Sequence, residues 1–538
     1  MKQLSGSDNI FLVGEHANVY NHVAMMLIYD VSTAPEGKVR YRDILQHFEN
    51  RLYAHPIFRR RLVTPPFGID RPYWVEDDDM DVEFHIRHIA LPEPGDWRQL
   101  MIQVARLHSR PLDRTKPMWE AYVIEGLDNI PKLPKGSFAL FMKLHHSAVD
   151  GMAGILLAEA IHSPTAIETI NVPSTRIIKL ESLPSPIEFV SRAVTNSIER
   201  VGRFTKLAQR AADVVTTLGK EQLAHRLGRS SEPPLAMPKP PLTRFNANVS
   251  GHRVAEGFGI PLSRIRRVRA KVPGASLNDI FLAISGGAVR RYLQSKHELP
   301  AESLVALMPM SLRSDASAGG NAIGAAMVAI RSDIADPLSR LKAAHFEAGK
   351  GKRIAEKMGA DLFATVFDVV PSFMGNFVLN KLLIKNFNMT ISNVRGPDKP
   401  LYLAGAKAMC LYPISIPTNG AGLNITGVSY NGVMWVAAVG CRNILPDPGF
   451  FVQCMREEWE DLLAGADALP EPGDLAAAAA AAAAATRSKP APRKVPVKRT
   501  KTAAKAPTKA VSAKPAAKPA AKPVARKAAA PTARKKAG

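Results

Sequence analysis

The fold is decided by one stretch near the end of the first third of the chain, Phe138-Ala-Leu-Phe-Met-Lys-Leu-His145-His146-Ser-Ala-Val-Asp150-Gly151. Every second residue from Phe138 onward is large and apolar, which is typical of a strand with one buried face. His146 continues that apolar face, while His145 points to the other face with Lys143. The alternation therefore predicts that one of two adjacent histidines is directed to the interior.

A helix is predicted directly after this strand, over residues 152–161. Asp150 stands where a helix N-cap is expected, because its carboxylate can accept hydrogen bonds from the first turn. A strand end, an imidazole, a carboxylate and a helix N-terminus thus meet within one short loop. We interpret this loop as the candidate active site.

Histidine is the side chain best suited to proton transfer near neutral pH. A single buried histidine is more often structural than catalytic, and Asp150 has simple helix capping as its alternative. The combined pattern His-His-x-x-x-Asp-Gly between strand and helix is much more specific. No metal is expected, because adjacent strand residues point to opposite faces and do not easily share one ion.

Composition places the basic charge mainly in one part of the chain. The 538 residues include 71 Lys and Arg against 48 Asp and Glu, but 17 of the basic residues and none of the acidic ones follow position 486. The rest of the chain is close to balanced, so it need not bind a polyanion. The three cysteines show no metal or disulfide spacing, which favours a reducing compartment.

The start of the chain lacks the apolar core of a signal peptide. No run approaches the roughly 18 apolar residues that a spanning helix needs. The sequence therefore predicts a cytoplasmic protein that touches a membrane, if at all, only from its side.

The composition divides the chain into four parts. Residues 1–165 form a first α/β half, 166–245 a helical linker with a basic amphipathic helix, 246–465 a second α/β half, and 466–538 a disordered tail rich in Ala, Lys and Pro. The tail has no aromatic residue and cannot bury enough apolar surface to fold.

Local patterns predict the main elements inside these parts. Strands are expected at 23–29, 81–89, 119–125, 138–146, 253–259, 305–308, 323–331 and 387–391, and a hairpin at 423–439 around Asn431-Gly432. Helices are expected at 43–52, 97–108, 152–161, 187–218, 222–227, 262–271, 354–387 with a break at Pro371, and 450–464. Ser276 and Asp279 predict a capping box at the start of a further helix.

Several ordered segments carry a resemblance to a known family. They are 4–8 (LSGSD), 111–119 (PLDRTKPMW), 145–151 (HHSAVDG), 245–253, 277–280 (LNDI), 308–313 with 320–321, and 391–397 (ISNVRGP). In these the chain resembles the bacterial bifunctional wax ester synthase/acyl-CoA:diacylglycerol acyltransferases, which share the chloramphenicol acetyltransferase-like fold. The resemblance covers roughly residues 1–465, and the tail lies outside it.

The resemblance implies two chloramphenicol acetyltransferase-like α/β halves with the active-site channel between them. His146 fills the position of the general base, Asp150 holds the loop, and His145 supports it. Asn278, Asp279, Ser392 and Asn393 are implied candidates for acceptor binding or oxyanion stabilisation. For Asn278 the alternative, a polar residue in the first turn of a helix, stays open.

The implied reaction is long-chain O-acyl transfer from acyl-CoA to diacylglycerol, to a fatty alcohol, or to both. Acyl-CoA is then a substrate, and no cofactor is expected. The implied location is cytoplasmic, with peripheral association with the inner membrane or lipid inclusions. Two alternatives remain: another CoA- or carrier-protein-dependent condensing acyltransferase, and a non-catalytic lipid-granule coat with a DNA-binding tail. The basic tail fits anionic lipid, nucleic acid or neither.

Overall fold

The computed structural model describes residues 1–149, 151–167, 184–227, 229, 237–311, 323–358, 366, 368–369 and 386–470. Three predictions concern residues outside this part: the capping role of Asp150, most of the apolar helical section 354–387, and the basic tail. Everything that follows refers to the described residues.

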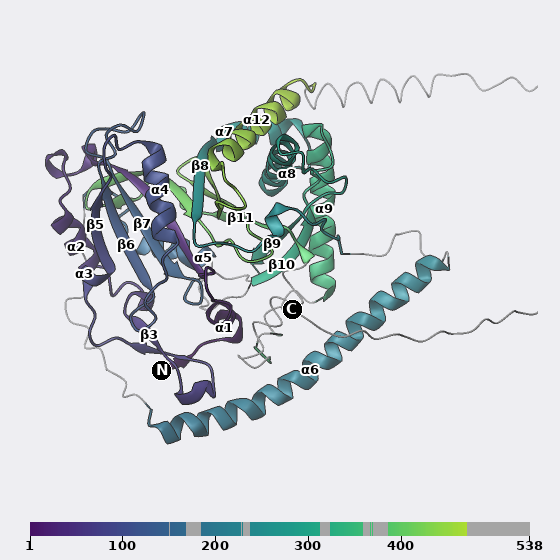
Figure 1. Cartoon of the computed structure of the whole chain (residues 1–538), viewed down its shortest axis with the longest axis horizontal. Coiled ribbons are helices and arrows are strands. Elements are labelled where there is room, and N and C mark those ends of the chain that lie inside the picture. The colour runs from purple at the N-terminus through teal and green to yellow at the C-terminus, as the bar shows by residue number, and fades with distance from the viewer. Residues whose placement is uncertain are drawn as a thin grey trace, which may run out of the picture. The chain divides into compact units, whose positions relative to one another are not determined.

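A six-stranded sheet carries the histidine strand at its centre (Figure 1). Its order is β12 (Tyr402–Leu403), β13 (Ala406–Ile414), β2 (His22–Asp30), β7 (Phe138–His145), β6 (Trp119–Glu125) and β5 (Ile86–Ala90). All eight residues of β7 are buried, so both faces of the sheet are covered. Apolar side chains of α2 (Tyr41–Glu49) and α5 (Gly151–Ala160) lie on one face, and those of α4 (Trp97–His108) lie on the other.

A second six-stranded sheet is built from the later part of the chain. Its order is β10 (Ile323–Ala329), β9 (Val305–Ser311), β11 (Met389–Arg395), β14 (Asn424–Tyr430), β15 (Val433–Cys441) and β8 (Arg253–Pro261). The predicted type I′ hairpin is confirmed, since Asn431 and Gly432 both have positive φ (45° and 80°). The helices of this half are α7 (Leu262–Lys271), α8 (Leu277–Ser295), α9 (Pro337–Met358) and α12 (Pro448–Asp467).

The second half contributes two strands to the sheet of the first half. The strands β12 and β13 belong to the second half by sequence, yet β13 pairs antiparallel with β2 of the first sheet. No strand was predicted for residues 402–414. The helix α12 continues to Asp467, two residues beyond the predicted boundary at 465.

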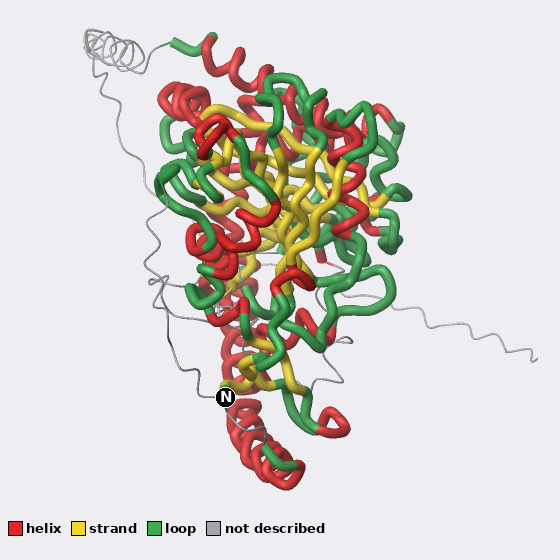
Figure 2. The backbone as a smooth tube through the Cα atoms, turned by 90° about the vertical axis from the view of Figure 1, so that its left-hand side faces the viewer, coloured by secondary structure: helices red, strands yellow, loops and turns green. Residues whose placement is uncertain are grey.

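A small three-stranded sheet and one long helix complete the fold. The small sheet has the order β1 (Lys2–Gln3), β4 (Tyr73–Glu76), β3 (Arg60–Val63), and beside it stand α1 (Gly6–Val13) and the short helix η4 (Pro66–Gly68). Where two helices were predicted after residue 186, the structure has one, α6 (Pro186–Arg226) (Figures 1 and 2).

The predicted strand at 81–89 is only half right. Asp81 caps a short helix, α3 (Val82–His85), by accepting hydrogen bonds from two backbone N–H groups, and the strand β5 begins only at Ile86. Local capping thus overrides the alternating pattern there. None of the described helices combines the length and the apolarity needed to cross a bilayer.

Candidate active site

His146 is the first residue beyond β7 and leaves the ladder there. Its backbone N–H donates to the carbonyl oxygen of Asn21 (2.8 Å), which ties the end of β7 to the start of β2. The imidazole is half-buried and stacks on Phe11 of α1, with ring centroids 4.0 Å apart and an interplanar angle of 14°. The ring is therefore held on one side by α1 while part of its surface remains accessible.

His145 is buried, with 1 % of its surface exposed. Its Nδ1 accepts the backbone N–H of Ser147 (3.1 Å) and lies 2.7 Å from the Ser147 hydroxyl oxygen. The second ring nitrogen, Nε2, is directed toward the segment that follows α1. That nitrogen lies 3.2 Å from Oε1 of Glu15. His145 thus fastens the catalytic loop to the segment that follows α1.

Glu15 completes this connection with three partners. Its carboxylate accepts the backbone N–H of Asn21 (2.5 Å), pairs with the Arg114 guanidinium and faces His145. Burial alone would raise the pKa of Glu15, but the hydrogen bond and charge of His145, with Arg114 and Asn21, lower its pKa to about 2. Glu15 is therefore a charged anchor beneath the loop.

Sequence reasoning missed Phe11, Glu15 and Arg114. Arg114 lies inside the segment 111–119 quoted for the family resemblance, but nothing in that segment shows that it reaches a glutamate about a hundred residues earlier. Phe11 and Glu15 follow the opening segment 4–8 closely. The only signal near them was the opening segment 4–8, which carried the family resemblance but no assigned chemistry.

The predicted strand–loop–helix arrangement around the motif is confirmed. The backbone N–H of Ala148 donates to the carbonyl of His145 (3.0 Å), Val149 is buried, and α5 begins at Gly151. The strand β11 packs beside α5, and its Val394 packs against the apolar cluster that contains Ile155 of α5. The second sheet therefore reaches the helix that the motif precedes.

Asn278 and Asn393 are brought together by the second half. Asn278 is the second residue of α8 and is exposed; its Oδ1 accepts a hydrogen bond from Nδ2 of Asn393 on β11 (2.5 Å). Ser392 precedes Asn393 on the same strand and points to the opposite face. Of the two β11 candidates, only Asn393 thus joins Asn278.

Asp279 caps the N-terminus of α8. Its carboxylate accepts the backbone N–H of Ser276 (2.8 Å), while the Ser276 hydroxyl accepts the N–H of Asp279 (3.1 Å), which confirms the predicted capping box. The same carboxylate accepts a hydrogen bond from Nδ1 of His345 on α9 (2.8 Å). Because both interactions hold α8 in place, the geometry gives no support to a substrate-binding role for Asp279.

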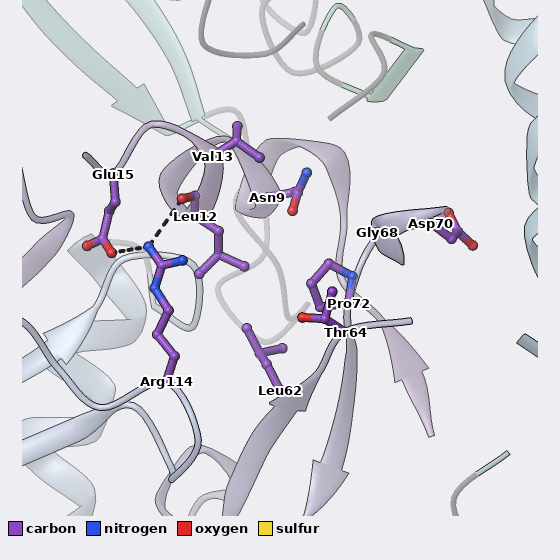
Figure 3. A pocket seen from close by; sticks show the side chains of 10 residues that line it. All are labelled: Asn9, Leu12, Val13, Glu15, Leu62, Thr64, Gly68, Asp70, Pro72 and Arg114. Carbon is purple, nitrogen blue, oxygen red and sulfur yellow. Dashed lines mark hydrogen bonds and ion pairs between the residues drawn. The ribbon is translucent and has the colours of Figure 1, made fainter. Parts of the chain in front are cut away.

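A pocket of about 440 Å³ opens beside α1 (Figure 3). Its lining comes from α1, the loops that follow it and the small sheet: Asn9, Leu12, Val13, Glu15, Leu62, Thr64, Gly68, Asp70, Pro72 and Arg114. Glu15 and Arg114 form one wall, so the pocket reaches the carboxylate that pairs with His145. Within the described part of the chain, no group of His, Cys, Asp or Glu is arranged to hold a metal ion.

The architecture places the chain in a class of two-lobed α/β proteins that includes condensation domains. The first condensation domain of the calcium-dependent antibiotic synthetase has the same fold, with a TM-score of 0.52 at 15 % identity, covering 87 % of this chain and 96 % of that one. The wax ester synthase/diacylglycerol acyltransferase of Marinobacter aquaeolei VT8 is more similar. Its TM-score is 0.61 at 26 % identity, over 87 % of this chain and 100 % of that chain.

The family follows from sequence. The profile of the wax ester synthase/diacylglycerol acyltransferase catalytic domain matches residues 4–281, and that of the WS/DGAT C-terminal domain matches 319–463. The O-acyltransferase WSD of Acinetobacter baylyi is 32 % identical over 83 % of this chain and 93 % of its own length. A putative diacylglycerol O-acyltransferase of Mycobacterium tuberculosis is also 32 % identical, over 88 % of this chain and 100 % of its own length. The chain belongs to the wax ester synthase/diacylglycerol acyltransferase family and is an O-acyltransferase.

Proposed function

We propose that this enzyme transfers a long-chain acyl group from acyl-CoA to the hydroxyl of diacylglycerol, of a fatty alcohol, or of both, with His146 as general base. The observation that carries the proposal is the half-buried imidazole of His146 at the end of β7, stacked on Phe11 and backed by the His145–Glu15 pair. Family membership supplies the reaction class, and the names of its relatives supply the acceptors.

In the proposed reaction, neutral His146 takes the proton from the acceptor hydroxyl as its oxygen attacks the thioester carbonyl. A tetrahedral oxyanion forms, the carbon–sulfur bond breaks, and the proton on His146 passes to the departing thiolate. The products are an ester and free CoA. None of the three cysteines is exposed, and all are outside the loop, so the direct transfer needs no acyl-enzyme.

The Asn278–Asn393 pair is the proposed polar group of the second half. An amide N–H can stabilise an oxyanion or orient an acceptor hydroxyl. Asn393 uses one of its two amide protons for Asn278, and the second remains available for substrate. The hydrogen bond between the two amides fixes their orientation, so the pair can offer an N–H to substrate in a defined direction.

The decisive experiment measures thiol release from palmitoyl-CoA with dioleoylglycerol and with hexadecanol in parallel. Substituting His146 by alanine is expected to lower kcat at least about a hundredfold with both acceptors, as loss of a general base does. His88→Ala, which removes a partly exposed histidine of β5, is the matched control. Full activity of His146→Ala would contradict the assignment of the base.

The proposed acceptors are lipids, so we further propose that the enzyme works peripherally at a membrane or lipid-inclusion surface. The helix α6 supports this, because its first 25 residues carry more basic than acidic side chains and many exposed apolar ones. For the basic tail, anionic lipid and nucleic acid both remain proposals that a binding experiment separates.

A further inference from the structure

The helix α6 exposes an apolar face that nothing in the described chain covers. Its members recur every three or four residues, so they lie on one side of the helix. They are 51–82 % exposed: Ile187, Val190, Val194, Ile198, Val201 and Phe204. Side chains of this size are normally buried, and a continuous apolar face on a surface marks an interaction site.

Contacts with the small sheet fix the direction of this face. Asn196 donates to Oδ2 of Asp70 (2.6 Å), and Arg200 forms an ion pair with the same carboxylate. Phe189 and Ala193 are buried, and Phe189 meets Tyr73 with ring centroids 5.7 Å apart. The apolar face lies on a different side of the helix from these four residues, so it is turned away from the sheet.

Further exposed apolar side chains lie at η4, just before the residue that anchors α6. Phe67 is fully exposed at a position with φ 57°, and the following Gly68 has φ 62°, so a tight turn holds the ring outward. Ile69 is 40 % exposed. Asp70, which anchors α6, comes next in the chain. We call Phe67, Ile69 and the six residues of α6 the apolar rim.

The turn that bears Phe67 and Ile69 also contributes to the pocket beside α1. Gly68 and Asp70 belong both to the turn that bears the rim and to the pocket lining. The opposite wall of the pocket is formed by Glu15 and Arg114 (Figure 3), and Glu15 pairs with the neighbour of His146. The pocket thus lies between the turn that bears Phe67 and the Glu15 carboxylate that holds the catalytic loop.

We propose that the apolar rim docks onto a lipid surface and that the pocket receives the hydroxyl-bearing head of the acceptor from that surface. This inference rests on the proposed function, and it specifies where the lipid acceptor enters. Donor acyl-CoA carries a large charged head and can reach the enzyme from solution, so its delivery does not require the rim.

Charge favours lipid over a second copy of the chain. Between residues 187 and 210, α6 carries five basic residues (Arg192, Arg200, Arg203, Lys206 and Arg210) against two acidic ones (Glu188 and Glu199). Two such helices facing each other across a two-fold axis would repel, whereas anionic headgroups would attract each of them. A lipid surface also accommodates the protruding Phe67 without a matching cavity.

The docking test uses the full chain and sedimentation with vesicles of phosphatidylcholine and phosphatidylglycerol containing dioleoylglycerol. High salt, about 0.5 M, screens the attraction of the basic tail but leaves apolar insertion in place. Under these conditions Phe67→Ser and Ile198→Ser should each lower the vesicle partition coefficient roughly tenfold, the effect of withdrawing one large apolar side chain. Leu242→Ser, at an 84 % exposed residue outside the rim, is the matched control.

The pocket test places a bulky side chain at the mouth, Thr64→Trp. It should raise KM for vesicle-borne dioleoylglycerol at least about fivefold while KM for palmitoyl-CoA stays within about twofold, because only the acceptor uses this pocket. A rise in KM for palmitoyl-CoA instead would overturn the assignment of the pocket.

Two outcomes would overturn the docking surface. One is vesicle partition of Phe67→Ser and Ile198→Ser equal to that of the unmodified enzyme. The other is a lipid-free dimer that both substitutions convert to a monomer, which would show that the rim binds a second copy of the chain. Because partition is measured without turnover, vesicle binding by an enzyme that acylates no acceptor would refute the proposed function and leave the docking surface standing.

Discussion

At the scale of single residues, two adjacent histidines have different chemistry because their surroundings differ. His145 uses both ring nitrogens for protein partners, Ser147 and Glu15, and is fully buried. His146 has a ring face on Phe11 and keeps part of its surface accessible. A proton acceptor must reach the substrate, so only His146 fits that role, and His145 fits the role of an anchor.

The first prediction concerns the stability contributed by Glu15. Its pKa is lowered from 4.5 to about 2, so its stabilising effect is complete above pH 4.5 and is lost as the pH falls toward 2. Glu15→Gln should therefore cost roughly 2–3 kcal/mol of unfolding free energy at pH 7. The difference between the two proteins should be about half as large at pH 3.

Urea unfolding at both pH values measures this difference. Glu49→Gln is a suitable control, because Glu49 is exposed at the end of α2. A cost for Glu15→Gln that is the same at pH 7 and pH 3 would show that the carboxylate acts by shape alone, without its charge.

The second prediction compares Asn278 with His145. Asn278→Ala should lower kcat about tenfold or more and change stability by less than about 0.5 kcal/mol, because the side chain is exposed. His145→Ala should cost roughly 3 kcal/mol of stability, because it leaves the largely buried Glu15 charge without this partner. Steady-state kinetics combined with urea unfolding separates the two effects.

The hydrogen bond between Asn278 and Asn393 predicts how their two substitutions combine. If the two amides act as a pair, Asn278→Ala/Asn393→Ala should be no slower than the slower single variant. Additive losses in log kcat would mean that each asparagine acts independently.

At the scale of elements, the helices and strands that short-range sequence patterns encode were predicted. The helices α4 and α7 have the predicted bounds, and the strand β7 and the β14–β15 hairpin are found within two residues of theirs. The strand β13 was missed because its C-terminal half, Cys410 to Ile414, lacks alternation and includes Pro413. Only pairing with β2, almost four hundred residues earlier, makes them a strand.

The site shows the same division between local and distant information. The loop from His145 to Gly151 and the capping box of α8 are local, and both were predicted. The Glu15–His145 pair and the Asn278–Asn393 bond join residues more than a hundred positions apart. Neither pair has a spacing that a sequence pattern could reveal.

The third prediction tests the packing of the exchanged strand. A Cβ atom on Gly257 of β8 would lie 2.7 Å from both Tyr412 of β13 and the carbonyl oxygen of Val436. Gly257→Ala should therefore destabilise the protein by about 1–3 kcal/mol, the usual cost of overpacking a core. Gly349→Ala is the control: nothing lies near its Cβ position, and alanine in the helix α9 should stabilise by about 0.5–1 kcal/mol.

Thermal unfolding of both variants checks the sign as well as the size. Equal midpoints for Gly257→Ala and the unmodified protein would mean that β8 and β13 can separate without cost. In that case the strand exchange would contribute little to holding the two sheets together.

At the scale of the whole molecule, charge and apolar surface are distributed to different parts of the chain. The basic excess is concentrated after position 486, whereas the apolar rim lies on η4 and α6. Electrostatic attraction acts over about 10 Å and weakens with salt, while apolar insertion is short-ranged and persists in salt. The two features can therefore be separated experimentally.

The fourth prediction is that removal of residues 471–538 leaves catalysis intact. All the candidate site residues lie before position 394, and the final described helix ends at Asp467. With a water-dispersed acceptor such as octanol, kcat and KM should stay within about twofold of those of the full chain.

Binding to anionic vesicles or to DNA should weaken at low salt and lose most of its salt dependence, because the released counterions are mainly those of the tail. Comparing vesicles and a DNA duplex at two salt concentrations assigns the tail its partner. A truncated enzyme that no longer turns over octanol would instead make the tail part of the catalytic body, and the division of labour between tail and rim would be wrong.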